Sequence, residues 1–389
     1  MKLQKRAGAM LGIATSVLLM TTACGGGLLG GDEGGGDESG PIKVGMIVPS
    51  SGSSAPTGAS MANGAQLAID EINEAGGVLD GRKLELVTAD DACDPQQAVA
   101  GANKLVSSGV VISVGGYCSG ATLPTLPIFD KAGVPMIIPA ANSQDLVSEG
   151  LKSVFLINGT GLQQSTAALD FIKKEGYSSL ALVDDNTSYS VDITTETESQ
   201  VTADGTVDVV LNSSVNAGES DYSAVVRDIV SSGADIVYWT GYYQEGGLII
   251  DQLRKKGYEG DIMVADGSAD STLAEIAGAA AEGVYATMTP TPNTIDGAEA
   301  WIEDYKEAFG EDPKPYSTQS YDAVRLAAAA FEDAGSTDTD EVIAALEAID
   351  GFDAFSGPLS FTPEHTLANG GFVILVMENG DFLLHDALQ

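Results

Sequence analysis

Basic residues and histidine are scarce in this chain. Its 389 residues include 18 lysines and arginines against 56 aspartates and glutamates, which gives a net charge of −38 at pH 7. Such a surface disfavours nucleic acid and electrostatic docking on anionic lipid, because both partners are themselves negatively charged. The acidity is explained either by adaptation to a salty setting or by the need for a solubilising surface.

Metal-binding and catalytic patterns are also missing. There is no Cys-x-x-Cys pair, and the two histidines, His365 and His385, both lie near the C-terminus. We therefore expect no zinc or redox site, no metal and no cofactor. There is no GxSxG, no HExxH and no phosphate-binding P-loop, and carboxylates are too numerous to single out a catalytic pair. We do not expect an enzyme.

Outside the N-terminal leader the chain has no long apolar run. Three basic residues precede an apolar stretch from Ala7 to Met20, which is shorter than the roughly 20 residues that cross a bilayer. Small residues then lead to Cys24. This pattern predicts a signal peptide over residues 1–23 and not a transmembrane helix.

Cys24 lies in a stretch, Thr-Thr-Ala-Cys, that resembles the lipobox of bacterial lipoproteins, although Thr21 stands where leucine is usual. The resemblance implies cleavage before Cys24 and a lipid on its thiol. Ordinary cleavage that leaves a free thiol is the alternative. The glycine-rich residues 24–40 are predicted to form a flexible tether between the lipid and a folded domain.

From residue 42 onward, short apolar runs alternate with helical patterns. This rhythm occurs twice and predicts two doubly wound parallel sheets, an α/β fold with two lobes. Three helical patterns and a hairpin around Asn379-Gly380 follow. The predicted strands span 42–48, 84–90, 110–114, 134–140, 154–158, 180–185, 207–212, 235–240, 261–266 and 284–288, and the later helices span 298–309, 316–334 and 340–349.

Residues 89–120 carry the strongest local signals. Asp94-Pro95 marks a helix start, and the run VVISV predicts a buried strand. A glycine-rich turn containing Ser119 follows that strand. Such a turn is where α/β proteins bind small ligands, and free backbone N–H groups there favour a carboxylate or phosphate. The segment also contains two of the three cysteines, Cys93 and Cys118.

The stretches DDACDPQQAVAGANKLV and GGYCSGAT resemble the periplasmic binding proteins for branched-chain amino acids (Leu/Ile/Val), the receptors of ABC importers. GAQLAIDEINEAGGVLDGRKLELV and MIIPAAN belong to the same likeness, which extends over nearly all of the chain from residue 42. It implies the type I periplasmic binding protein fold, in which the chain crosses three times between lobes. Lobe 1 is then about 41–160 plus 290–358, and lobe 2 about 161–289 plus 359–389.

The same resemblance assigns roles to individual residues. It implies a disulfide between Cys93 and Cys118, where two buried free thiols are the alternative. It places Ser119, Ala140 and Asn142 at the ligand's α-carboxylate, with Asn142 where the family usually has Thr or Ser.

Lobe 2 is expected to supply an acidic residue and two tyrosines. Asp266, where the family commonly has Glu, is expected to meet the ammonium. Tyr189 and Tyr242 also follow predicted strands of lobe 2 and are expected to face the crevice. The resemblance also places Tyr117 and Thr57, both in lobe 1, at the ligand side chain, and Tyr316 of lobe 1 is expected to close the same pocket.

We therefore expect a monomeric, lipid-anchored, extracytoplasmic receptor that binds an amino acid and delivers it to an ABC permease. Contacts from both lobes would make ligand binding favour closure. Three alternatives stay open: a ligand-binding sensor for a signalling partner, a receptor for a small amide or another solute, and a structural surface lipoprotein.

Overall fold

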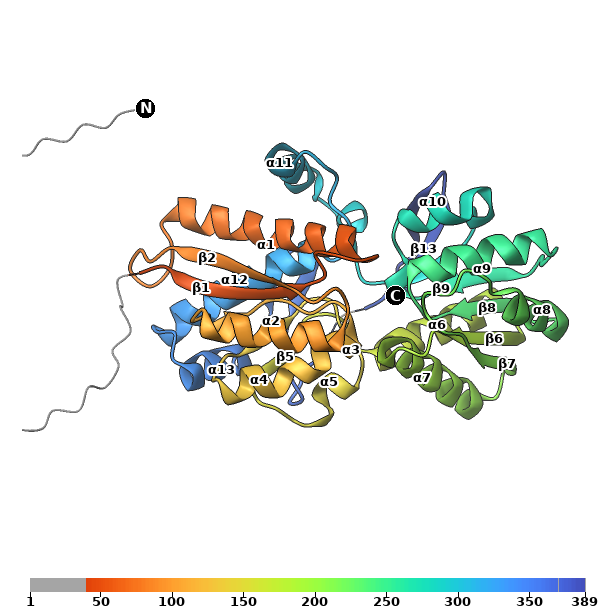
Figure 1. Cartoon of the computed structure of the whole chain (residues 1–389), viewed down its shortest axis with the longest axis horizontal. Helices are drawn as coiled ribbons and strands as arrows, with labels where there is room; N and C mark the ends of the chain where they lie inside the picture. Colours follow the sequence, from red (N-terminus) through yellow and green to blue (C-terminus); the bar gives the residue numbers. More distant parts are fainter. Residues whose placement is uncertain (1–39, 370, 389) are drawn as a thin grey trace, which may run out of the picture. The chain divides into compact units, whose positions relative to one another are not determined.

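The computed structural model describes residues 40–369 and 371–388. The predicted signal peptide of residues 1–23, Cys24 and nearly all of the predicted tether lie outside the described residues. The remainder contains two large sheets and a short hairpin. We call each large sheet, with the helices that pack beside it, a lobe (Figure 1).

The sheet of lobe 1 has five parallel strands in the order β2-β1-β3-β4-β5. Except in the edge strand β2, their residues are mostly buried, as a parallel sheet between helices requires. The strands are β1 (Ile42–Val48), β2 (Leu84–Asp90), β3 (Ile112–Ser113), β4 (Met136–Ile138) and β5 (Val154–Leu156).

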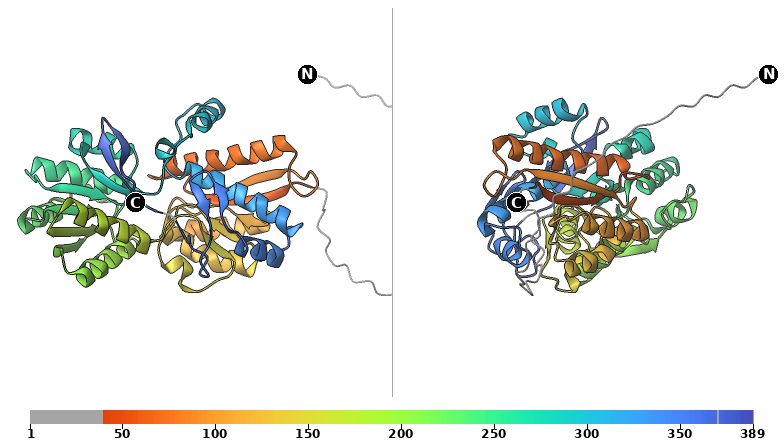
Figure 2. Two further views of the ribbon diagram at one scale, coloured as in Figure 1. Left: turned by 180° about the vertical axis from the view of Figure 1, so that it is seen from behind. Right: turned by 60° about the vertical axis from the view of Figure 1, so that its left-hand side comes forward.

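The sheet of lobe 2 has seven strands in the order β14-β13-β10-β9-β8-β6-β7. The five from β6 to β10 are parallel, and a C-terminal hairpin adds to β10 in antiparallel pairing, visible in violet in Figure 2. The strands are β6 (Ser179–Asp184), β7 (Asp208–Ser214), β8 (Ile236–Trp239), β9 (Asp261–Val264), β10 (Tyr285–Met288), β13 (Val373–Glu378) and β14 (Asp381–Asp386).

Helices cover both sheets, as Figure 1 shows. Lobe 1 has α1 (Ala55–Ala75), α2 (Pro95–Ser107), α3 (Ser119–Thr122), α4 (Leu126–Lys131), α5 (Asp145–Ser148), α11 (Glu299–Phe309), α12 (Ser317–Ala334) and α13 (Thr339–Glu347). Lobe 2 has α6 (Gly161–Glu175), α7 (Ser188–Asp204), α8 (Ser223–Ser232), α9 (Tyr243–Lys255) and α10 (Thr272–Ala277).

The predicted helix start at Asp94 is present. The Asp94 carboxylate accepts the backbone N–H groups of Gln96 and Gln97, and Pro95 takes the first helical position of α2. The strand that follows is shorter than the predicted 110–114, because only Ile112 and Ser113 pair with neighbours. Just after it, the backbone turns where a Cβ on Gly115 would meet the backbone nitrogen of Ile47 at 2.5 Å.

The short hairpin of β11 (Phe352–Ala354) and β12 (Gly357–Leu359) was not predicted. Its turn is held from a distance: the buried Asp322 carboxylate on α12 accepts the backbone N–H of Phe355 at 2.8 Å. Because this tie joins residues far apart in sequence, no local pattern indicates it. The C-terminal hairpin was predicted correctly around Asn379 and Gly380, which both have positive φ.

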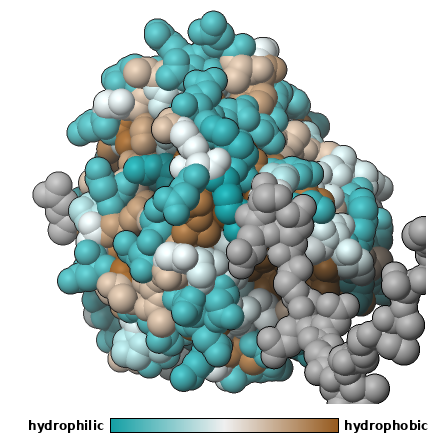
Figure 3. All heavy atoms as spheres, turned by 90° about the vertical axis from the view of Figure 1, so that its left-hand side faces the viewer, coloured by the Kyte–Doolittle hydropathy of each residue, from teal (hydrophilic) through white to brown (hydrophobic). Residues whose placement is uncertain are grey.

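The chain passes between the two sheets three times: after β5, after β10 and before β13. The predicted fold class, two doubly wound lobes with a three-crossing hinge, is confirmed. On the face seen in Figure 3, hydrophilic residues separate smaller hydrophobic patches. Among residues 40–369 and 371–388, no helix has the length and hydropathy needed to cross a membrane.

Candidate functional site

Both lobes use the same strand order. In lobe 1 it is β2-β1-β3-β4-β5, and in lobe 2 the strands β7-β6-β8-β9-β10 repeat it. In such sheets, ligands bind outside the carboxyl ends of the strands, where the order reverses. The predicted site residues follow these ends: Thr57 after β1, Tyr117 and Ser119 after β3, Ala140 and Asn142 after β4, Tyr189 after β6, Tyr242 after β8 and Asp266 after β9.

Asp266 lies at the centre of this group and is only 3% exposed. Its Oδ1 accepts the phenol O–H of Tyr189, and its Oδ2 accepts the phenol O–H of Tyr316 at 2.7 Å. The backbone N–H of Gly267 also donates to Oδ1, at 3.1 Å. Tyr316 precedes α12 of lobe 1, so the carboxylate is held from both lobes.

Burial raises the pKa of Asp266 above its ordinary value, and the hydrogen bonds from Tyr189 and Tyr316 offset part of that rise. The pKa values of Tyr189 and Tyr316 are also raised, first by burial and then by the nearby Asp266 charge. Both phenols therefore stay neutral and keep their protons for donation to the carboxylate.

Ser119 and Asn142 lie together across from Asp266. The Ser119 hydroxyl oxygen accepts the backbone N–H groups of Asn142 and Ser143, both at 3.3 Å. Because its lone pairs are used in this way, the Ser119 O–H remains a donor for another group. The Asn142 Nδ2 lies 3.4 Å from Asp266 Oδ2. The Asn142 amide, which the resemblance places at the ligand's α-carboxylate, therefore donates inside the protein.

Four tyrosines form an aromatic cluster around the same carboxylate. The ring of Tyr117 lies 5.9 Å from that of Tyr242 and 5.7 Å from that of Tyr316, and Tyr189 lies 5.1 Å from Tyr242. Thr57 is buried beside Tyr117. The structure thus brings together the residues predicted for the ligand side chain.

Sequence reasoning missed Gln164 on α6, a polar residue of this group. It is fully buried, and its Nε2 donates to Asp266 Oδ1 at 3.0 Å. A signal for it was present, because Gln164 shares the buried face of α6 with Ala168 and Phe171 at helical spacing. Apolar residues are expected on the buried face of a helix, so a polar side chain there is informative.

Ala140 contributes through its backbone. Its carbonyl oxygen accepts the amide of Asn158 at 2.6 Å, and both residues are buried. Asn158 directly precedes the first crossing. The bond therefore ties the loop after β4 to the hinge and fixes the neighbouring Asn142 in place.

The predicted disulfide between Cys93 and Cys118 is present, with 5.4 Å between the two Cα atoms. It links the start of α2 to the turn that carries Tyr117 and Ser119. The prediction of a disulfide is confirmed, and the alternative of two free thiols is wrong for this structure.

Further contacts join the lobes around the site. The Lys314 ammonium of lobe 1 lies 3.1 Å from the Asp270 carboxylate of lobe 2. The phenol of Tyr243, at the start of α9, donates to the backbone oxygen of Ser53 at 2.8 Å. These bonds do not pass through Asp266, so lobe contact does not depend on that carboxylate alone.

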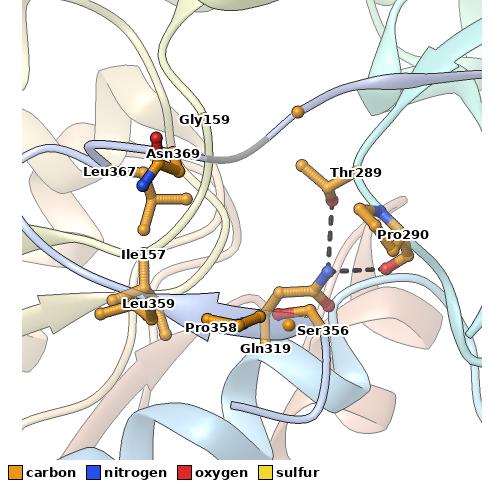
Figure 4. Close-up of a pocket in the computed structure, with 12 residues that line it drawn as sticks. Ile157, Gly159, Thr289, Pro290, Gln319, Ser356, Pro358, Leu359, Leu367 and Asn369 are labelled. Carbon is orange, nitrogen blue, oxygen red and sulfur yellow. Dashed lines mark hydrogen bonds between the residues drawn. The ribbon is translucent and has the colours of Figure 1, made fainter. Parts of the chain in front are cut away.

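A separate cavity of about 270 Å³ lies at the crossings (Figure 4). All three crossings line it, together with the β11–β12 turn and Gln319, whose amide donates to Thr289 Oγ1 and to the Pro290 carbonyl. None of the predicted ligand residues is among its lining residues. The cavity therefore belongs to the hinge and not to the Asp266 group.

Comparison with known proteins shows what this architecture resembles. The family model described as periplasmic binding protein matches residues 41–381. A Leu/Ile/Val-binding protein homolog from Brucella melitensis is 34% identical over 87% of this chain and 91% of its own length. A leucine-, isoleucine-, valine-, threonine- and alanine-binding protein from Pseudomonas aeruginosa is 36% identical over 86% and 89%.

Among solved structures, a leucine-binding protein from Thermotoga maritima has a TM-score of 0.81 and 27% identity, covering 88% of this chain and 97% of that one. The family model matches most of the chain, and the two sequence relatives exceed 30% identity over nearly all of their length. The chain belongs to the periplasmic binding protein family, among the branched-chain amino acid binding proteins.

Proposed function

We propose that the protein is the substrate-binding component of an ABC importer, which binds an amino acid between its two lobes and delivers it to a membrane permease. The observation that carries the proposal is the Asp266 carboxylate, buried where side chains of both lobes converge. The donors that reach this carboxylate from the described residues are all neutral, so its charge has no cationic partner there, and an ammonium group would supply one.

The other parts of an amino acid also find complementary groups here. The free O–H of Ser119 suits the α-carboxylate. The cluster of Tyr117, Tyr242 and Tyr316 offers an aromatic wall for a side chain. The names of the relatives, which mention leucine, isoleucine and valine and in one case also threonine and alanine, support an amino acid as the ligand.

The proposed mechanism is closure of the hinge. A ligand that contacts Asp266 of lobe 2 and Ser119 of lobe 1 binds the closed arrangement better than an open one, so it shifts the population toward closure. The permease then recognises the closed lobes. Small-angle scattering with and without ligand tests this step, and an unchanged radius of gyration at saturating ligand contradicts it.

Binding itself is tested by calorimetric titration of the protein after unfolding and refolding, which removes carried ligand. The panel contains the twenty amino acids, urea and short amides. We expect compounds of one chemical class in this panel to bind. We expect Asp266→Asn to weaken that binding at least about 100-fold, since it removes the charge that meets the ammonium. Asp296→Asn, the same change at an exposed carboxylate, is the control.

We also propose that the protein is extracytoplasmic and held to the membrane by a lipid on Cys24. The small residues before this cysteine support the proposal. Cys24→Ser is expected to move the protein from the membrane fraction to the soluble fraction of the producing cells. An unchanged distribution overturns the anchor and leaves the binding proposal intact.

A further inference from the structure

A lysine between two prolines reaches from lobe 1 to lobe 2. Pro313 and Pro315 flank Lys314 in the segment before α12, where they stiffen the backbone and disfavour a helical conformation at the lysine. The Lys314 backbone N–H donates to the hydroxyl of Ser60 on α1 at 2.9 Å, and its carbonyl oxygen accepts the hydroxyl of Ser317 at 2.7 Å. The backbone of Lys314 is therefore fixed to lobe 1, while its side chain extends toward lobe 2.

Asp270 of lobe 2 meets this side chain. The Lys314 ammonium lies 3.1 Å from Asp270 Oδ1 and 3.4 Å from Oδ2. The carboxylate is held within its own lobe, because Oδ1 also accepts the backbone N–H and the hydroxyl of Thr272, at 2.8 and 2.6 Å. Asp270 is only 5% exposed. Since each lobe positions its own partner, the ion pair forms where the lobes meet at little cost in side-chain ordering.

Both lobes carry a large net charge of the same sign. Lobe 1, residues 41–160 and 290–358, contains 9 basic and 27 acidic residues, a net charge of −18. Lobe 2, residues 161–289 and 359–389, contains 6 basic and 25 acidic residues, a net charge of −19. Bringing two such bodies together costs electrostatic free energy, because exposed like charges repel over about 10 Å at 0.1 M salt. Hinge closure has to overcome this repulsion.

The repulsion is also present at one contact between the lobes. Asp192 on α7 accepts the backbone N–H of Gln144 from lobe 1 at 3.1 Å. Burial raises the pKa of Asp192 to about 6, and the charges of Glu196 and of Asp145, which belongs to lobe 1, contribute to the rise. Apart from Lys314, each lysine or arginine that pairs with a carboxylate in the described part of the chain does so within its own lobe.

We propose that the Lys314–Asp270 ion pair is an electrostatic latch, which holds the two acidic lobes together and thereby strengthens the binding of a ligand that it does not touch. The inference rests on the proposed function, because the latch acts on the closure that accompanies ligand binding. Its contribution depends on salt. At 1 M salt the Debye length falls to about 3 Å, so the repulsion between the lobes is screened and the latch contributes less.

The test compares Lys314→Met with Lys306→Met. Both changes remove one lysine charge from lobe 1, but Lys306 pairs with Asp312 of the same lobe. The amino acid that binds best is titrated calorimetrically at about 50 mM and about 1 M NaCl. At low salt we expect Lys314→Met to bind at least about tenfold more weakly than Lys306→Met, because the Asp270 charge loses its partner in the closed form. At high salt this ratio is expected to fall to about threefold or less.

Asp270→Asn and the double variant Lys314→Met/Asp270→Asn complete a double-mutant cycle. Asp270→Asn alone is expected to weaken binding relative to wild type. In the Asp270→Asn protein, the further change Lys314→Met is expected to alter the affinity less than about twofold, because the pair is already broken. This comparison leaves no buried charge unpaired, so it remains decisive if Lys314→Met alone folds poorly. A tenfold loss from Lys314→Met in both backgrounds, or a ratio to Lys306→Met that does not change with salt, overturns the latch.

Failure of the latch and failure of the proposed function are distinguishable. If wild type binds none of the amino acids, the proposed function fails, and small-angle scattering of the free protein then decides on the latch. We expect a larger radius of gyration for Lys314→Met than for Lys306→Met at low salt, because the lobes repel each other. Equal radii of the two variants overturn the latch in that case.

Discussion

Asp91, directly after β2, is a buried carboxyl group that we expect to destabilise the protein at neutral pH. It is 1% exposed, and its Oδ1 accepts the Cys93 N–H at 2.9 Å while its Oδ2 is buried without a partner. Burial, with a smaller contribution from Asp90, raises the pKa of Asp91 from 3.8 to about 6.

The sign of the effect follows from proton binding. Between pH 4 and 6 the folded protein holds a proton on Asp91 that the unfolded chain has lost, so stability falls as pH rises through the folded pKa. At 1.36 kcal/mol per unit, this shift corresponds to roughly 3 kcal/mol at pH 8. Asp91→Asn removes the charge and with it the pH dependence.

The change is measured by urea unfolding of wild type and Asp91→Asn between pH 4 and 8. The new amide nitrogen is itself buried without a known partner, at a cost of roughly 1–3 kcal/mol that does not vary with pH. The informative quantity is therefore the difference between the two proteins as a function of pH. We expect it to move by roughly 2.5 kcal/mol in favour of the variant from pH 4 to pH 8, because part of the effect is already present at pH 4.

Asp296→Asn provides the matched control, since it removes one negative charge from an exposed position. Any general gain from lowering the net charge of −38 appears in both variants and cancels. Parallel stability curves for wild type and Asp91→Asn over the whole pH range would refute the argument that burial controls this carboxyl group.

Three further changes test the packing. Cys93→Ser with Cys118→Ser opens a cross-link with a sequence separation of 25 and is expected to cost roughly 3–4 kcal/mol of unfolding free energy, and wild type in reductant should match it. Asp322→Ala removes the carboxylate that accepts the Phe355 N–H in the β11–β12 turn and should cost about 1–3 kcal/mol by urea unfolding. Gly64→Ala places a Cβ 2.1 Å from a backbone oxygen of α12 and should lower the unfolding free energy by about 1–3 kcal/mol, and an unchanged midpoint contradicts that packing.

Much of the fold was readable from the sequence because each element has a local cause. The cap at Asp94 and the turn at Asn379-Gly380 depend on neighbouring residues, and both were predicted. The β11–β12 hairpin was not, because its strands are three residues long and its turn is held by Asp322, over thirty residues earlier. Local patterns carry no information about such ties.

In the candidate site, too, some features could be predicted from local sequence and others could not. Residues after strand ends could be predicted because a doubly wound sheet places those ends along one edge. The orientation of Asn142 could not, since it depends on Gln164, which comes from a helix of the other lobe. A sequence motif states which side chain is present, whereas the choice between its donor and its acceptor is made by tertiary partners.

Under the proposed function, the orientation of the Asn142 side chain affects which ligand the two lobes select. Asp266 receives donors from both lobes, and Gln164 passes the polarity of its carboxylate on to Asn142 across the lobe boundary. The charge on one lobe therefore sets the hydrogen-bonding character of the other. If Asp266 were replaced by a neutral acceptor, Gln164 would lose the constraint that fixes its nitrogen, and Asn142 could present either atom. Under the proposed function, the hydrogen-bond network as a whole selects the ligand, and not any one residue of it.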